Sequence, residues 1–219
     1  HYLGGSDLSK DNVLSDYSPA MQEYFSGWLK SKYQDESALQ KAWKDDNASF
    51  VNPRIPDKLE RLEGGIGMFR DPVKSRRAID YAEALSDVIC EGIAWYGAIV
   101  KEETQRKAIM MAYYGHIMDL GVHFLGEQVG YLKQRAAIDC PDVDCFTGPI
   151  SYHSQFRDIG GTAAFDYPPP PSLRMKNKIW LNECDVRTHL TNPPGYAYSV
   201  RHSYQTDEVL AREFAKALC

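Results

Sequence analysis

Residues Lys107-Ala-Ile-Met-Met-Ala-Tyr-Tyr114, which run into Gly115-His116, form the stretch that decides the fold class. A continuous apolar run of this length that ends at a glycine is typical of a strand buried on both faces, as in a parallel sheet. Two further candidate strands follow, and both end where polar residues begin. The sequence therefore predicts parallel strands near residues 107–114, 143–147 and 178–183.

Helical patterns precede and separate these strands. Ser18-Pro19 is typical of an N-cap followed by the first helical position, and apolar residues then repeat at helical spacing to about Tyr33. We expect further helices over 36–43, from Pro72 to about Thr104, from about Val122 to Ala136 and from about Thr206, with an irregular segment over 47–67 and a stiff polyproline loop at 167–171. Strands that alternate with helices predict a parallel sheet with crossover helices.

This order of elements predicts an α/β fold, and within it a partial (β/α)8 barrel. A complete barrel has eight strands and typically about 250 residues. This chain has 219 residues. We therefore expect residues 1–219 to form a single domain, the C-terminal part of such a barrel, with roughly its strands 5 to 7 and their flanking helices. A further chain or a missing segment would complete the barrel.

The composition of the chain indicates which classes of binding partner are not expected. The formal net charge is -5, from 25 basic and 30 acidic residues, and the basic residues are scattered, so we expect no nucleic acid partner. No run approaches the roughly 18 apolar residues of a membrane span, so we expect no membrane association. The five cysteines have neither the spacing nor the histidine partners of a zinc site, so we expect no metal and no cofactor. Cys140 and Cys145 are spaced for a small disulfide loop, but the odd total equally favours free thiols, and the cellular compartment stays open.

The C-terminal ends of the predicted strands carry the candidate site, because parallel barrels place their functional residues there. These strand ends bring polar and aromatic residues together: Tyr113, Tyr114 and His116, then Ser151, Tyr152 and His153, then Glu183, Asp185, Arg187 and His189. Aromatic rings suit the flat apolar faces of sugars, although amphipathic aromatic residues also cap protein cores. Their position has to decide between these two roles.

Two acids continue the apolar face of the third strand. A period of two places Ile179, Leu181, Glu183 and Asp185 on one face. Carboxylates are rarely buried without a partner, so this strand either enters a polar cavity or pairs its acids with Arg187. The ion pair suits Asp185, which could orient Arg187, better than it suits Glu183.

Four segments of the chain resemble the clan of retaining (β/α)8 glycosidases, and specifically the β-galactosidases of glycoside hydrolase family 42. The segment from Asp16 to Trp43 is similar to the one after the family's fourth strand, residues 144–161 to its sixth strand and loop, 178–190 to its seventh strand, and 206–218 to the following helix. The most specific part is the string Asn182-Glu183-Cys-Asp-Val-Arg187-Thr-His189.

The resemblance implies a retaining, β-galactosidase-like glycoside hydrolase in which Glu183 is the catalytic nucleophile, kept charged by Arg187 or another nearby donor. Residues at the strand ends would bind the carbohydrate substrate: Tyr114, Tyr152, His153, Asp185, Arg187 and His189. No residue matches the family's acid/base glutamate, whose place falls just before His1. The alternative is a non-catalytic carbohydrate-binding or scaffolding protein derived from such a barrel, and a homo-oligomer is compatible with either interpretation.

Overall fold

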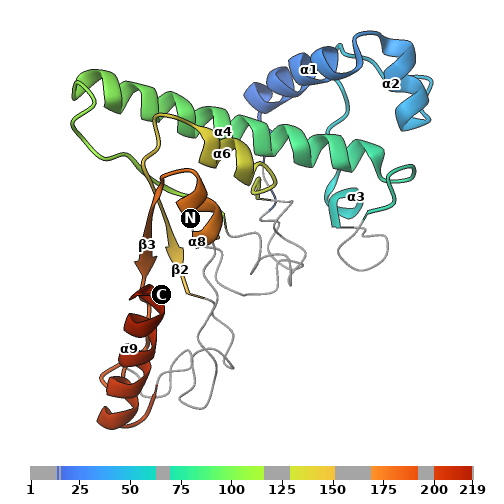
Figure 1. Ribbon diagram of the computed structural model, residues 1–219. Coiled ribbons are helices and arrows are strands. Elements are labelled where there is room, and N and C mark those ends of the chain that lie inside the picture. Colours follow the sequence, from blue (N-terminus) through green and yellow to red (C-terminus); the bar gives the residue numbers. More distant parts are fainter. Residues whose placement is uncertain are drawn as a thin grey trace. The chain divides into compact units, whose positions relative to one another are not determined.

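The computed structural model describes residues 14, 16–62, 70–115, 129–150, 169–191 and 200–218 (Figure 1). They form a mixed α/β fold that divides into two compact units, which are described one at a time. The first unit comprises residues 1–92 and 120–133, and the second comprises residues 93–119 and 134–219. The single domain over residues 1–219 stays a prediction.

Helices build the first unit. They are α1 (Pro19–Tyr33), α2 (Glu36–Trp43), α3 (Lys58–Leu62) and residues 76–92 of α4 (Arg76–Glu103). The starts of α1 and α2 confirm the sequence prediction, because the side chains of Ser18 and Asp35 accept the first free backbone N–H groups. Helix α4 begins later than Pro72, because the Asp71 carboxylate accepts the N–H groups of Val73 and Lys74 and holds the chain in a turn. Helix α3 corrects the expectation that 47–67 is irregular throughout.

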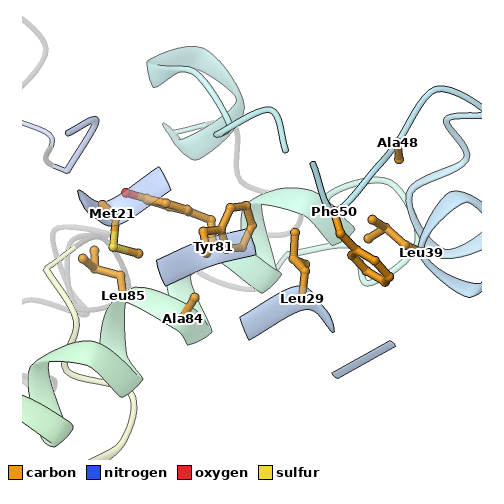
Figure 2. Close-up of a cluster of buried hydrophobic side chains, with 9 residues drawn as sticks. Met21, Leu29, Leu39, Ala48, Phe50, Tyr81, Ala84 and Leu85 are labelled. Carbon is orange, nitrogen blue, oxygen red and sulfur yellow. The ribbon is translucent and has the colours of Figure 1, made fainter. Parts of the chain in front are cut away.

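An apolar and aromatic core fills the first unit (Figure 2). Its buried members are Met21, Phe25, Leu29, Leu39, Ala48, Phe50, Tyr81, Ala84 and Leu85. The Phe25 ring meets Tyr81 edge-on at 5.2 Å between centroids and stacks on Trp43 at 6.1 Å. Helices α1, α2 and α4 thus share one core, and the aromatic residues of this part of the sequence serve packing.

Three parallel strands form the sheet of the second unit: β1 (Met111–Tyr113), β2 (Cys145–Pro149) and β3 (Ile179–Glu183), in that order across the sheet. Tyr113 aligns with Thr147, and Pro149 aligns with Glu183. The three predicted strands and their parallel direction are confirmed. Strand β1 is shorter than the predicted 107–114, because the chain leaves α4 through a turn in which Gln105 and Arg106 both have positive φ.

The other elements of the second unit are the end of α4, α6 (Gln134–Asp139), α8 (Pro170–Met175) and α9 (Ser203–Leu218). Helix α8 begins inside the proline run that was expected to be a loop, because proline is compatible with the first turn of a helix. Of the helix predicted over 122–136, residues 122–128 lie outside the described residues, and the prediction is wrong over 129–133, where the chain forms turns before α6 begins at Gln134. Among the described helices, none is long and apolar enough to cross a membrane.

One face of the sheet is exposed along its two outer strands, whereas the central strand β2 is buried throughout. Met111, Tyr113, Ile179 and Leu181 on the outer strands are 42–55% exposed, whereas Ala112, Tyr114 and Phe146 on the other face are at most 5% exposed. Because parallel sheets are normally covered on both faces, an open face with this much apolar surface is unusual. We call the surface of Met111, Tyr113, Ile179 and Leu181 the open face; Glu183 continues it, two residues after Leu181.

A buried lysine ties the N-terminal ends of the first two strands together. Lys101 donates to the carbonyl of Ala108 at 2.7 Å and pairs with the Asp144 carboxylate, which also accepts the N–H of Met110 at 2.8 Å. Partial desolvation acts against the charge of Asp144, but the bonds from Lys101 and Met110 and the lysine's charge lower the pKa of Asp144. This end of the sheet therefore serves stability.

Cys140 and Cys145 are both free thiols. Of the two arrangements that the sequence left open, the structure thus has the one without a disulfide. Desolvation, followed by the charge of Asp144, raises the pKa of Cys145.

Candidate functional site

Glu183 lies at the C-terminal end of β3, where the open face reaches the edge of the sheet. It aligns with Pro149 on the central strand, and its side chain is partly exposed. Alternation along β3 places it in line with Ile179 and Leu181, as the sequence predicted. The carboxylate is therefore held at a strand end, next to apolar surface and within reach of a ligand.

Tyr113 lies on the same face, at the end of β1, in one row with Thr147 and Leu181. Desolvation of its buried part, followed by the charge of Glu183, raises the pKa of Tyr113. Thr147 is fully buried and donates to the carbonyl of Leu181 at 2.9 Å. We call Tyr113, Thr147 and Glu183 the strand-end cluster.

Tyr114, which was predicted to lie in the same site as Glu183, is on the opposite face of the sheet from Tyr113. It is 1% exposed, whereas Tyr113 is 55% exposed. Tyr113, and not Tyr114, therefore shares the face of Glu183. The period of two that was applied to the third strand also separates Tyr113 from Tyr114, but only the register shows which of them shares the face of Glu183.

Three other candidates follow β3: Asp185, Arg187 and His189. Their contacts hold the loop after this strand in place. The Arg187 guanidinium lies 3.2 Å from the Asp185 carboxylate, which is the ion pair that the sequence analysis favoured for Asp185. The N–H of His189 donates to the hydroxyl of Thr206 at 3.1 Å, and the Nδ1 atom of its ring lies 2.8 Å from the same oxygen. Since Thr206 belongs to α9, these bonds connect the loop to that helix.

Tyr152 and His153, which complete the predicted set, lie outside the described residues, as does His116. Their positions relative to Glu183 stay predictions. Within the described ranges, no group of three or more His, Cys, Asp or Glu side chains is arranged to hold a metal ion.

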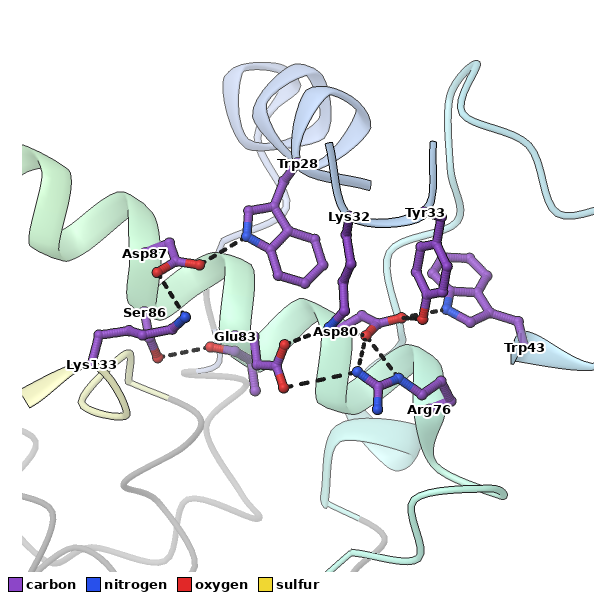
Figure 3. A network of polar contacts seen from close by, with 11 residues as sticks. Trp28, Lys32, Tyr33, Trp43, Arg76, Asp80, Glu83, Ser86, Asp87 and Lys133 are labelled. Carbon is purple, nitrogen blue, oxygen red and sulfur yellow. Dashed lines mark hydrogen bonds and ion pairs between the residues drawn. The ribbon is translucent and has the colours of Figure 1, made fainter. Parts of the chain in front are cut away.

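A dense polar network in the first unit has another role (Figure 3). Asp80 is fully buried, and its carboxylate accepts from Lys32 at 2.9 Å, from Tyr33 and Trp43 at 2.7 Å each, and from Arg76 at 2.6 and 2.9 Å. Desolvation and the hydrogen bond to Asp80 raise the pKa of Tyr33 to about 12. Both oxygens of Asp80 are thus used by the protein itself, which assigns the network to the stability of the unit.

Several side chains of this network come from one segment of the sequence. Trp28, Lys32, Tyr33 and Trp43 all lie within residues 16–43. Trp28 donates to Asp87 at 2.9 Å, Lys32 lies over the Trp28 ring at 4.5 Å, and the others bind Asp80. These residues hold α1 and α2 against α4 and leave the candidate chemistry to the second unit.

The arrangement at the strand ends suits a limited range of chemistry. A partly exposed carboxylate that shares its face with a phenol can act as a nucleophile, act as a base or bind the hydroxyl groups of a polyol. Comparison with known proteins adds no relative: no family model matches the chain, and no curated protein matches it.

Proposed function

We propose that this chain is the nucleophile-bearing part of a retaining, β-galactosidase-like glycoside hydrolase. One observation carries the proposal: Glu183 ends a parallel strand on the open face, and its side chain is partly exposed there. Catalytic residues of (β/α)8 enzymes lie at this end of their strands. The sequence string around Glu183, which resembles the seventh strand of such enzymes, supports the same assignment.

The open face supports a barrel as the complete architecture. In a barrel, the inward faces of the strands pack against one another and the outward faces lie beneath helices. Met111, Ile179 and Leu181 would then fill the interior, and the buried face of Ala112 and Phe146 would be the outer one. In this proposal the remaining strands come from another part of the polypeptide or from a partner chain.

The proposed reaction needs two carboxyl groups about 5–5.5 Å apart. Glu183 attacks the anomeric carbon and forms a covalent glycosyl-enzyme, while the second group protonates the leaving oxygen. The second group then takes a proton from the water that hydrolyses the ester and restores the Glu183 carboxylate. We place this acid/base in the part that completes the barrel, and assign substrate binding to Tyr152, His153, Asp185, Arg187 and His189.

Glu183→Gln tests the proposal in the protein with its completing part. We expect turnover of an aryl β-glycoside to fall at least about a thousandfold, with folding and sugar binding preserved, because the amide keeps the shape but not the nucleophile. Glu208→Gln, at an exposed position of α9, is the matched control and should keep full activity. Full activity in Glu183→Gln would contradict the assignment.

The same experiment separates the alternative function. If the intact wild-type protein binds sugars but never cleaves an aryl glycoside, and Glu183→Gln weakens that binding, the protein is a carbohydrate-binding derivative of a barrel. Binding calorimetry with galactose and glucose, alongside the turnover assay, distinguishes the two.

A further inference from the structure

We propose that Thr206 is a positioning residue for His189: its hydroxyl holds the imidazole in the neutral form that carries its proton on Nε2, and this N–H group is presented to an oxygen of the ligand. The identity of the ligand as a sugar rests on the proposed function, whereas the contact between the two residues does not. Thr206 is not among the residues that the sequence predicted to serve the site.

Two contacts join His189 to Thr206. The backbone N–H of His189 donates to the Thr206 hydroxyl oxygen at 3.1 Å, and the Nδ1 atom of the ring lies 2.8 Å from the same oxygen. Thr206 is only 7% exposed, so its hydroxyl proton needs an acceptor inside the protein. The two contacts therefore hold both the backbone and the ring of His189 against α9.

A count of protons decides the direction of the ring contact. A threonine hydroxyl has one proton to donate and two lone pairs that can accept. In helices this proton often goes to the carbonyl four residues earlier, here that of His202, but this oxygen already accepts the N–H groups of Gln205 and Thr206. Among the described residues, Nδ1 of His189 is the acceptor within hydrogen-bonding distance of the hydroxyl. Nδ1 thus accepts, and the ring proton is on Nε2.

The start of α9 gives this contact a fixed support. The Gln205 side-chain carbonyl accepts the N–H groups of Arg201 and His202 at 2.9 and 3.0 Å, so a side chain of the same turn closes the helix start. His189 follows Glu183 by six residues, in the loop that leaves the C-terminal end of β3. The ring is therefore held at a defined place in this loop.

The opposite nitrogen of the ring is left for a ligand. Within the part of the chain that the structure describes, no residue is hydrogen-bonded to Nε2 of His189, and the side chain is partly exposed. An N–H group of a neutral imidazole donates to hydroxyl, carbonyl or carboxylate oxygens. In the proposed hydrolase, the acceptor is a hydroxyl oxygen of the sugar.

A packing role alone explains Thr206 less well. Valine has the same shape and suits the buried face of α9, on which Val209 is 1% exposed, but valine cannot donate to a ring nitrogen. Thr206→Val should therefore fold normally, as checked by circular dichroism, and lose both contacts with His189. Thr206→Ser keeps the hydroxyl and should keep both contacts.

Nitrogen NMR of the ring tests the contact and needs no enzymatic activity. The intact protein is labelled with [¹⁵N]histidine and measured at about pH 8.5, where an ordinary histidine is neutral. The signals that disappear in His189→Gln are assigned to His189. We expect the proton on Nε2, and an Nδ1 signal that moves in Thr206→Val and returns to its place in Thr206→Ser. Ser203→Ala, which removes an exposed hydroxyl from the same turn of α9, is the control that should leave the signal unchanged.

Two results would overturn the contact. One is a ring that carries its proton on Nδ1 in the wild type. The other is an Nδ1 signal that is the same in the wild type and in Thr206→Val.

Kinetics test what the contact does for the ligand. We expect Thr206→Val and His189→Phe to raise KM for an aryl β-glycoside about 3- to 10-fold with kcat nearly unchanged, because a neutral hydrogen bond made equally in the ground state and the transition state contributes to binding alone. Thr206→Ser should restore the wild-type KM. Unchanged KM in Thr206→Val and His189→Phe would overturn the positioning role and leave the proposed function standing. The expected ring signals in an intact protein without glycosidase activity would overturn only the proposed function.

Discussion

Two carboxylates of this chain show how environment sets the role of a residue. Asp80 has no exposed surface, and four side chains donate to it. Glu183 is partly exposed at a strand end. A carboxylate that the protein saturates stabilises the fold, whereas a carboxylate that the protein leaves accessible can meet a ligand.

Replacing Asp80 should therefore strongly destabilise the first unit. Asp80→Asn leaves Lys32 and Arg76 without their shared buried partner, and breaking a buried ion pair in this way costs about 3 kcal/mol or more. Urea denaturation measures the loss. Glu83→Gln is the matched control, since Glu83 pairs with the same two cations from a more exposed position, and it should cost about 1 kcal/mol or less. Equal losses in the two variants would contradict this role for Asp80.

Asp144 should make the stability of the second unit depend on pH. The pKa of Asp144 is lowered in the folded state. Its contribution to the free energy of unfolding is therefore fully present above its pKa in the unfolded chain, near 4, and is lost as the pH falls through its pKa in the folded protein. We expect the free energy of unfolding to fall less in Asp144→Asn than in the wild type between about pH 5 and pH 2. Denaturation at each pH measures this difference. Asp207→Asn, at an exposed position of α9, is the control that should change the profile less. An unchanged profile in Asp144→Asn would rule out this coupling.

The sequence could predict only those site residues that lie close together in the chain. The choice of Glu183, made from the string Asn182 to His189, stays a prediction, whereas the ion pair of Asp185 with Arg187 is confirmed. Tyr113 and Tyr114 were both named at the first strand end, but which of them shares the face of Glu183 depends on the register of β1 against β2 and β3, which a single strand sequence does not contain.

Among the elements, those with a strong local signal were predicted well. The Ser18-Pro19 cap located α1, and a continuous apolar run that ends at a glycine located β1. Helices α3 and α8 were missed, because both are short and α8 begins with prolines that also suit a loop. The open face was not anticipated either, since apolar runs predict strands that are covered on both sides.

The two faces of the sheet should respond differently to truncation. Phe146 is 1% exposed on the covered face, so Phe146→Ala should cost about 3–5 kcal/mol of unfolding free energy. Leu181 is 49% exposed on the open face, so Leu181→Ala should cost about 1 kcal/mol or less in the 219-residue chain. Denaturant titration of both variants checks the difference.

The same pair of variants tests what covers the open face. In a complete barrel Leu181 becomes an interior residue, and Leu181→Ala should then cost about 2 kcal/mol or more. If Leu181→Ala costs equally little with and without the completing part, the open face is not a barrel interior.

The two units of the whole molecule have different roles in the proposed function. The first unit is packed around an aromatic core and the saturated Asp80, and the second presents a parallel sheet with one open face and the strand-end cluster. Local patterns predicted the longer helices and the strands of both units, but not α3 and α8. What lies on the open face depends on contacts between distant segments, for which a single sequence gives no periodic signal.

The most direct measurement of the central claim is covalent trapping of the nucleophile. The intact protein is incubated with a 2-deoxy-2-fluoro-β-galactoside that carries a good leaving group, digested and analysed by mass spectrometry. The account predicts one labelled peptide with the sugar on Glu183, and no label in Glu183→Gln. A sugar attached to a different carboxylate, or a glycosidase that cleaves its substrate without any labelling of Glu183, would contradict it.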